Sequence, residues 1–211
     1  MKVKNNFVSI IALGNFNPAI LSPDFLKDSC KFETTDEAKG KATPVVTAIE
    51  FGDTSFILEL EKFQIMERNQ SSIDFLRIMS VMVNYLDVLK FTPVHVMGLN
   101  INVDISEKDE ALFDKLNDPR FVCKIFNSDT ILYDKKMVFS SDGETPIRWE
   151  FTKGDDPVYK LSIDWLEDFF RVNLNVEKRD IIKARDQINY LSSHSEEIII
   201  EFNSLITQIW N

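Results

Sequence analysis

The sequence VHVMGLNINVDI, residues 94–105, decides the fold. Apolar residues alternate with polar ones along it, first at even positions and, after Met97-Gly98, at odd positions. An alternation of period two places the apolar side chains on one face of a β-strand, so this segment predicts a half-buried strand. One extra residue in a strand reverses the phase of such a pattern, and we therefore predict a β-bulge at Gly98.

The residues before this strand predict a second strand, a short helix and a hairpin. Residues 7–13 are an apolar run of the kind found in buried strands, and Ser22-Pro23 is typical of a helix start, here for residues 23–28. Residues 45–61 alternate on both sides of Gly52-Asp53, which predicts a hairpin with a tight turn. The polar segment 33–43 is interpreted as a loop.

A helix is predicted for residues 71–90. Ser71 and Asp74 resemble a capping box, and the polar residues that follow fall on one narrow stripe at helical spacing. The remaining surface of the helix is mostly apolar. Such a helix must be covered on more than one side, by the sheet and by a second layer or a partner chain.

The second half predicts further strands and a long C-terminal helix, separated by turn-rich segments. The helix runs from about Glu177 to Ile209, and Ser192-Ser193-His194-Ser195 predicts a kink or a split within it. Ahead of it we expect a helix at 107–116, strands at 121–126, 131–139, 147–151, 159–165 and 170–176, and turns at 141–143 and 153–157.

Together these elements predict an α+β protein made of two linked units of largely antiparallel sheet, each covered by a long helix. Residues 1–106 form the first unit and residues 107–211 the second, and we expect them to pack as one domain. The two halves share too few identical residues to establish a repeat from sequence.

Composition and charge exclude several classes of partner. The formal net charge is −10, from 24 basic and 34 acidic residues, and the chain has no dense basic patch, so nucleic-acid binding is disfavoured. No segment approaches the roughly 20 apolar residues of a membrane-spanning helix. Cys30 and Cys123 are too few for a disulfide framework, and the N-terminus lacks a small-residue cleavage site, so we expect a cytoplasmic protein.

The chain offers no catalytic, metal or cofactor motif. His95 and His194 are its only imidazoles and neither has a partner for nucleophilic catalysis in its own segment. No glycine-rich phosphate loop and no metal-ligand spacing occur. We therefore predict no cofactor, no metal and no catalytic residue, which favours a protein that is not an enzyme.

Aromatic residues gather between positions 149 and 170, and two interpretations of them stay open. They either fill the core or form a binding surface, because aromatic side chains are prominent in both. Core packing is favoured for those that share one strand face, such as Tyr159. As candidates for an interface we name Trp149, Trp165 and Phe169.

Two stretches of the chain resemble an uncharacterised bacterial protein family. They are residues 98–103, which follow a long helix, and Leu161-Ser162-Ile163-Asp164-Trp165 together with the last helix. That family has a strand of the type L-x-I-D followed by a helix with L-x-x-H, matched here by Leu191 and His194, and then F-x-x-x-I-T, matched by residues 202–207. Where the family often has Arg-Tyr, this chain has Asn100-Ile101. The resemblance implies an architecture of two α+β units and a bacterial origin.

Two functional hypotheses follow. The first is a non-catalytic binding or assembly protein that acts through protein–protein contacts, with a partner protein or with itself. The reason is that the helix predicted for residues 71–90 is apolar around most of its surface and that the sequence has no catalytic motif. The alternative is a small-molecule binder or enzyme, whose ligand lies between the sheet and a helix. In that case His95 and Asn100 are the predicted ligand-binding residues.

Overall fold

The computed structural model describes residues 3–68, 75–105, 147–152, 158–165, 169–178 and 183–210. The described strands form a single nine-stranded sheet in the order β2-β3-β4-β5-β1-β6-β9-β8-β7, and every neighbouring pair is antiparallel. The strands are β1 (Val3–Gly14), β2 (Lys39–Ala42), β3 (Val46–Phe51), β4 (Thr54–Glu59), β5 (Lys62–Arg68), β6 (Val94–Ile105), β7 (Ile147–Thr152), β8 (Val158–Trp165) and β9 (Phe170–Lys178). The helices are η1 (Pro18–Ile20), η2 (Phe25–Ser29), α1 (Leu76–Val88), α4 (Ala184–Ser193) and α5 (Ser195–Trp210). The α+β class is confirmed.

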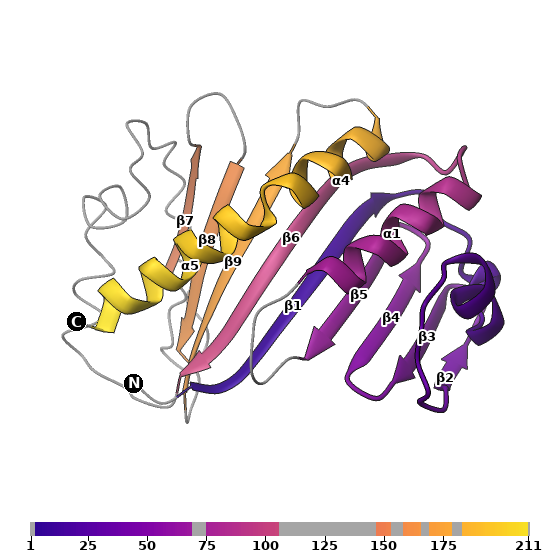
Figure 1. Cartoon of the computed structure of the whole chain (residues 1–211), viewed down its shortest axis with the longest axis horizontal. Coiled ribbons are helices and arrows are strands. Elements are labelled where there is room, and N and C mark those ends of the chain that lie inside the picture. Colours follow the sequence, from indigo (N-terminus) through magenta and orange to yellow (C-terminus); the bar gives the residue numbers. More distant parts are fainter. Residues whose placement is uncertain are drawn as a thin grey trace.

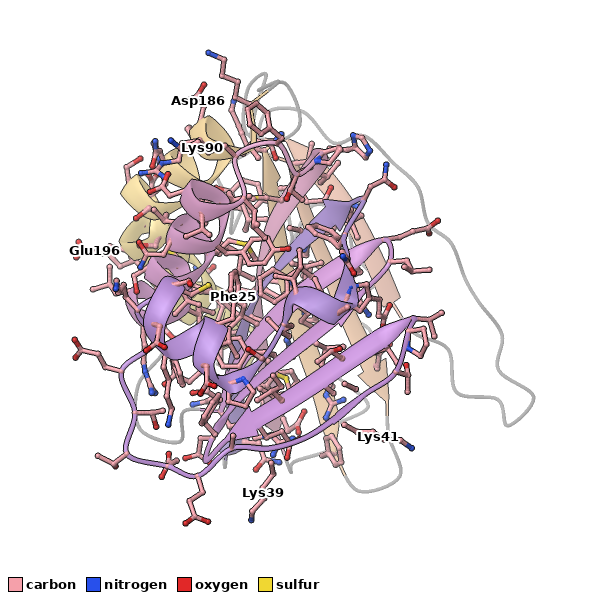
Figure 2. The ribbon with its side chains drawn as sticks, turned by 90° about the vertical axis from the view of Figure 1, so that its right-hand side faces the viewer. Phe25, Lys39, Lys41, Lys90, Asp186 and Glu196 are labelled. Atoms are coloured by element: carbon pink, nitrogen blue, oxygen red, sulfur yellow. The ribbon has the colours of Figure 1, made fainter. Side chains whose placement is uncertain are left out.

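The helices lie on one face of this sheet (Figure 1). Helix α1 contacts β1 and β5, and α4 contacts β6 and β9. Figure 2, turned toward the β2 edge, shows the helices on one side and Lys39 and Lys41 of β2 projecting outward. Phe25, labelled in the same view, is partly buried and packs against the core, where its ring meets that of Tyr85 edge-on at 6.1 Å between centroids.

The core lies between the helices and the sheet. Alternate residues of β1, such as Val8 and Ile10, and of β6, such as Leu99 and Ile101, belong to one buried cluster with residues of α1, α4 and α5. Helix α1 contacts η2 and α4 as well as the sheet, which accounts for the wide apolar surface noted in its sequence.

The predicted hairpin is confirmed as β3 and β4, which pair from Val46↔Glu59 to Phe51↔Thr54. Gly52, in the turn, has a φ of 53°, a left-handed conformation that glycine adopts without steric cost. Two strands were not predicted. β2 is exposed along its whole length and so carries no burial pattern, whereas β5 does alternate, with Phe63 and Ile65 buried.

The prediction of a β-bulge at Gly98 is wrong. Gly98 pairs in regular register with Ile11 on one side and Glu177 on the other. The irregularity lies earlier, where Leu13 pairs with Val96 but the next residue, Gly14, pairs with Val94. His95 is thus the extra residue. The alternation of apolar and polar residues does change phase along this strand. Because Val96 is apolar but only partly buried, the change shows in the sequence later than the bulge occurs in the backbone.

The predicted start of the last helix is also wrong. Glu177 and Lys178 remain in β9, where they pair with Gly98 and Met97 of β6, and the helix begins only at Ala184. The predicted split is confirmed, because α4 ends at Ser193 and α5 starts at Ser195. The strands predicted near 7–13, 147–151, 159–165 and 170–176 are present as β1, β7, β8 and β9.

Several predictions fall outside the described residues: the helix at 107–116, the strands at 121–126 and 131–139, the turns at 141–143 and 153–157, the capping box at 71–74, and Cys123. Within the described part, no helix has both the length and the apolar character needed to cross a membrane.

Candidate functional site

The face of the sheet opposite the helices carries a polar ladder, defined as Asn100, Asn102 and Asp104 of β6 with Arg171, Asn173 and Asn175 of β9. Because Leu99 and Ile101 point into the helical core, the residues that alternate with them point to this other face. Asn173 Nδ2 donates to Asn102 Oδ1 at 2.9 Å, and Asn175 Nδ2 donates to Asn100 Oδ1 at 3.0 Å. The two strands are thereby joined by side chains as well as by backbone.

Glycine at position 98 makes room for this ladder. A Cβ atom there would lie 2.8 Å from Asn175 Nδ2, closer than real Cβ contacts come. Asn100 is 8% exposed, yet its Nδ2 atom and the Oδ1 atom of Asn175 have no hydrogen-bond partner in the part of the chain that the structure describes. Each amide therefore uses only part of its hydrogen-bonding capacity.

An ion pair between a buried aspartate and a half-buried arginine ends the ladder. Asp104 is 2% exposed, and Arg171 holds it through two hydrogen bonds, Nε to Oδ1 at 2.8 Å and Nη2 to Oδ2 at 3.1 Å. Asn5 Nδ2 also donates to Asp104 Oδ2, at 3.3 Å. The hydrogen bond to Asp104 raises the pKa of Arg171 further above its ordinary value, with the charges of Asp104 and Asp164 acting in the same direction.

Two aromatic rings hold the guanidinium group of Arg171. Its Cζ atom lies 5.3 Å from the ring centroid of Phe7 and 5.6 Å from that of Phe169. A cation at this distance is attracted by the quadrupole of the ring. Arg171 is therefore fixed by a bidentate carboxylate and by two rings at once.

A cavity of about 470 Å³ opens beside this ion pair. Phe7 of β1 pairs directly with Arg68 of β5 across the sheet, which brings a second arginine to the same place. The described residues that line it are Asn5, Asn6, Phe7, Asp53, Met66, Arg68, Asp104 and Arg171.

The opposite end of β1 and the loops bonded to it carry exposed apolar side chains, which we call the apolar rim: Leu13, Val45, Leu60 and Phe91. Their exposed fractions are 44%, 57%, 49% and 97%. Val45 directly precedes Val46 and Leu60 directly follows Glu59, which form the terminal pair of β3 and β4, so the backbones of Val45 and Leu60 lie at the same end of this hairpin. Figure 2 shows Lys90, the neighbour of Phe91, on the side of the molecule that carries the helices.

Backbone hydrogen bonds join the loops of the rim. Phe16 N donates to Leu60 O at 2.8 Å, Gly14 N to Glu61 O at 3.0 Å, and Asn15 N to Pro93 O at 2.9 Å. The segment after β1 therefore bonds both to the β4–β5 turn and to the loop before β6. The close approach requires a glycine, because a Cβ on Gly14 would lie 2.0 Å from Pro93 O.

His95 and Asn100, the predicted ligand-binding residues, lie apart from the cavity lining. His95 is exposed at the bulge, and its carbonyl oxygen accepts from Gln187 Nε2 at 3.4 Å. Asn100 belongs to the polar ladder. Asp104, which does line the cavity, lies about 30 Å further along the strand from His95, at roughly 3.3 Å per residue.

Two of these aromatic residues, Tyr159 and Phe169, have described side chains, and the two lie in different surroundings. Tyr159 is 3% exposed and belongs to the core, as the sequence favoured. Phe169 lies against Arg171. Trp149 is in β7 and Trp165 is at the end of β8, where it pairs with Phe170 of β9. The structure therefore brings Phe169 to the ion pair and places the two tryptophans on different strands.

His194 contacts groups of helix α4, and Cys30 lies in the core. His194 Nδ1 lies 2.8 Å from Tyr190 O and 3.0 Å from Ser193 Oγ, at the break between α4 and α5. Cys30 is buried and forms no disulfide, and burial raises the pKa of its thiol to about 12. Among the described residues, no group of three or more His, Cys, Asp or Glu side chains could hold a metal ion.

Sequence reasoning missed the ion pair and the cavity, although one signal for the ladder was present. The sequences N-x-N-x-D at 100–104 and R-x-N-x-N at 171–175 are matched polar rows with opposite charges at their ends. Antiparallel pairing of those two rows would have predicted the ladder and the contact of Asp104 with Arg171. Nothing local links them to Phe7 or Arg68.

Neither a scan against protein-family models nor a search of curated proteins found a match to this chain.

Proposed function

We propose that this chain is a non-catalytic binding or assembly protein and that the apolar rim is its protein–protein contact surface. The observation that carries the proposal is Phe91, an aromatic side chain that is 97% exposed. Clustered exposed apolar side chains mark interaction sites, and aromatic residues supply much of the binding energy in such sites.

The energetics of the rim favour this role. Burying a Phe or Leu side chain contributes about 1.5–3 kcal/mol, so the rim has several such contributions available to a partner. The hydrogen bonds from the segment 14–16 to both neighbouring loops hold the rim in one arrangement. Binding to a pre-formed surface loses less conformational entropy than binding to a loose one.

The occupant of the rim is a partner protein or a second copy of this chain. The net charge of −10 opposes self-association through charged surfaces. An apolar contact surface lets two copies meet with fewer charges facing each other. The experiment below separates the two occupants.

We also infer the two-unit organisation on which an assembly role would build. Each unit begins with a long strand, β1 in the first unit and β6 in the second. The last strand of each unit pairs with the first one, β5 with β1 and β9 with β6. A helix then follows, α1 in one case and α4 in the other. The sequence placed the boundary after residue 106, whereas this strand order favours a boundary before β6.

Replacing Phe91 by Ser, alone and together with Leu60→Ser, tests the rim. If the chain self-associates, light scattering over a range of concentrations will show an assembled wild type and a monomeric double variant. If it binds another protein, a partner isolated from the native host and then purified will bind the wild type at least about tenfold more tightly than Phe91→Ser, the loss expected from one buried aromatic anchor.

Ile200→Ser is the matched control, because Ile200 is 68% exposed on α5 and lies outside the rim. It should leave the mass and the affinity unchanged. A wild type that is monomeric at all concentrations and has no purified partner would contradict the proposal, as would equal effects of Ile200→Ser and Phe91→Ser.

The alternative, a small-molecule binder with a pocket near His95, stays a prediction. The cavity beside Asp104 and Arg171 favours ligand binding at a different place on β6.

A further inference from the structure

The cavity beside Asp104 and Arg171 has the size and the lining of a ligand site. Pockets for small ligands have volumes of about 300–1,000 Å³ and combine apolar walls with a few converging polar groups. This cavity measures about 470 Å³ and draws its lining from β1, β5, β6, β9 and the β3–β4 turn. It lies near the start of β1, and the apolar rim lies at the end of that 12-residue strand, so the two surfaces are independent.

Arg171 is positioned for a further acceptor. Its Nε and Nη2 atoms donate to Asp104, and no partner of Nη1 occurs in the described part of the chain. The rings of Phe7 and Phe169 restrict the guanidinium group further. A donor that is already oriented loses little side-chain entropy when it binds a ligand.

Arg68 is the second donor, and its side chain has no ion-pair partner among the described residues. Three other arginines with described side chains each contact a carboxylate: Arg77 with Glu67, Arg171 with Asp104, and Arg185 with Asp87. Arg68 has no carboxylate within ion-pair distance among the described residues, and its side chain is exposed at the cavity. The backbone N–H of Arg68 donates to Asp53 O at 3.0 Å, which fixes the backbone position from which the side chain extends.

The apolar wall lies between the two arginines. Phe7 pairs with Arg68 across β1 and β5 while its ring carries Arg171, and Met66 lines the same cavity. A ligand whose oxygens reach both guanidinium groups therefore places its body against Phe7 and Met66. An aromatic or aliphatic body suits that wall.

The charges of the described lining residues balance, which disfavours a ligand with more than one negative charge. Arg68 and Arg171 supply two positive charges, and Asp53 and Asp104 supply two negative ones. Asp104 has both oxygens engaged by Arg171 and Asn5, so it repels a ligand less than a free carboxylate would. A planar carboxylate matches the donor fork of guanidinium, whereas a dianionic phosphate would bring excess negative charge into a lining that is already balanced.

We propose that this cavity binds a small organic carboxylate, whose oxygens accept hydrogen bonds from Arg171 and Arg68 and whose apolar body lies on Phe7 and Met66. Asp104 and Asn5 act by positioning Arg171. The site is separate from the rim, so loss of one leaves the other in place.

Benzoate is the probe, and titration calorimetry with ligand-observed NMR is the measurement. The wild type should bind benzoate saturably, and Arg68→Gln should bind it at least about tenfold more weakly, because one charge-assisted hydrogen-bonding partner is lost. Arg171→Lys should weaken binding as well, because an ammonium group lacks the planar set of donors with which guanidinium can bind Asp104 and the ligand at the same time. Circular dichroism establishes that each variant is folded.

Controls decide what the site recognises. Arg185→Gln removes an arginine outside the cavity and should leave benzoate affinity unchanged. Benzamide, which has the same shape without the charge, should not bind, and acetate, which lacks the apolar body, should bind more weakly than benzoate. The proposal is overturned by no saturable benzoate binding to the wild type, by equal affinities of wild type and Arg68→Gln, or by tighter binding of phenyl phosphate than of benzoate.

Discussion

Cys30 shows how burial alone sets the chemistry of a residue. Its side chain is inaccessible to solvent, and its backbone is held on both sides, with its N–H donating to Phe25 O and its carbonyl accepting from Asn84 Nδ2. Removal from water disfavours the thiolate, and the pKa of the thiol rises from 9.0 to about 12. Such a cysteine is inert in the folded protein, because the thiolate is the reactive species.

We predict that Cys30 makes the folded state less stable as the pH rises from 9 toward 12. In that interval the unfolded chain loses the thiol proton while the folded chain keeps it, so the contribution is fully present below pH 9 and is lost above it. Urea unfolding of Cys123→Ser, with and without Cys30→Ala, measures the effect. The stability difference between the two should shrink by about 1 kcal/mol between pH 9 and pH 10. Parallel pH profiles of the two variants would contradict this.

At the scale of elements, the ladder between β6 and β9 is a set of paired amides rather than a set of independent polar residues. Asn100 has Asn175 as its side-chain partner, and each retains an unused amide atom among the described residues. The loss of one partner leaves the other buried and unsatisfied, whereas the loss of both removes the desolvation cost from both sides.

We therefore predict that Asn175→Ala lowers the free energy of unfolding by about 1–3 kcal/mol, because it leaves Asn100 without its partner. The double variant Asn100→Val/Asn175→Val should be more stable than this single variant, since valine suits a strand and leaves no amide unpaired. Urea unfolding monitored by circular dichroism gives both values. Asn203→Ala, at an exposed position on α5, is the control and should change stability by less than about 0.5 kcal/mol. A double variant that is less stable than Asn175→Ala would contradict the pairing.

Strands β6 and β9 show what the periodicity of apolar residues can and cannot predict about an element. Alternation located β6 and β9 because it reports burial on one face. It misplaced the bulge, because the apolar Val96 continues the pattern of apolar residues at even positions after the backbone register has shifted at His95. It also ended β9 too early, because Glu177 and Lys178 have helical propensity and remain in the sheet only through pairing with β6.

At the scale of the whole molecule, β1 and β6 bind the two proposed units into one sheet. They pair along nearly their full lengths, from Val3↔Ile105 to Gly14↔Val94. Above them a single buried cluster contains residues of both halves, and the ion pair of Arg185 with Asp87 links α4 to α1. A unit that lost its neighbour would expose both a strand edge and part of the core.

We expect this molecule to unfold as one cooperative unit. All three tryptophans, Trp149, Trp165 and Trp210, lie in the second half of the sequence, so tryptophan fluorescence reports on that half while far-ultraviolet circular dichroism reports on both. The urea midpoints from the two signals should coincide, because the shared core and the β1–β6 pairing break together. Midpoints that differ beyond experimental error would show two independently folding domains.

The sequence by itself determined the α+β class, the hairpin with its glycine turn, most of the strands and the break in the last helix. These features depend on periodicity, turn chemistry and propensity, which act between residues close in the chain. Only the tertiary structure decided the two candidate sites. The cavity joins Phe7, Arg68 and Arg171, and the apolar rim joins Leu60 and Phe91. Which distant residues become neighbours depends on the order of strands in the sheet, and no local pattern in the chain encodes that order.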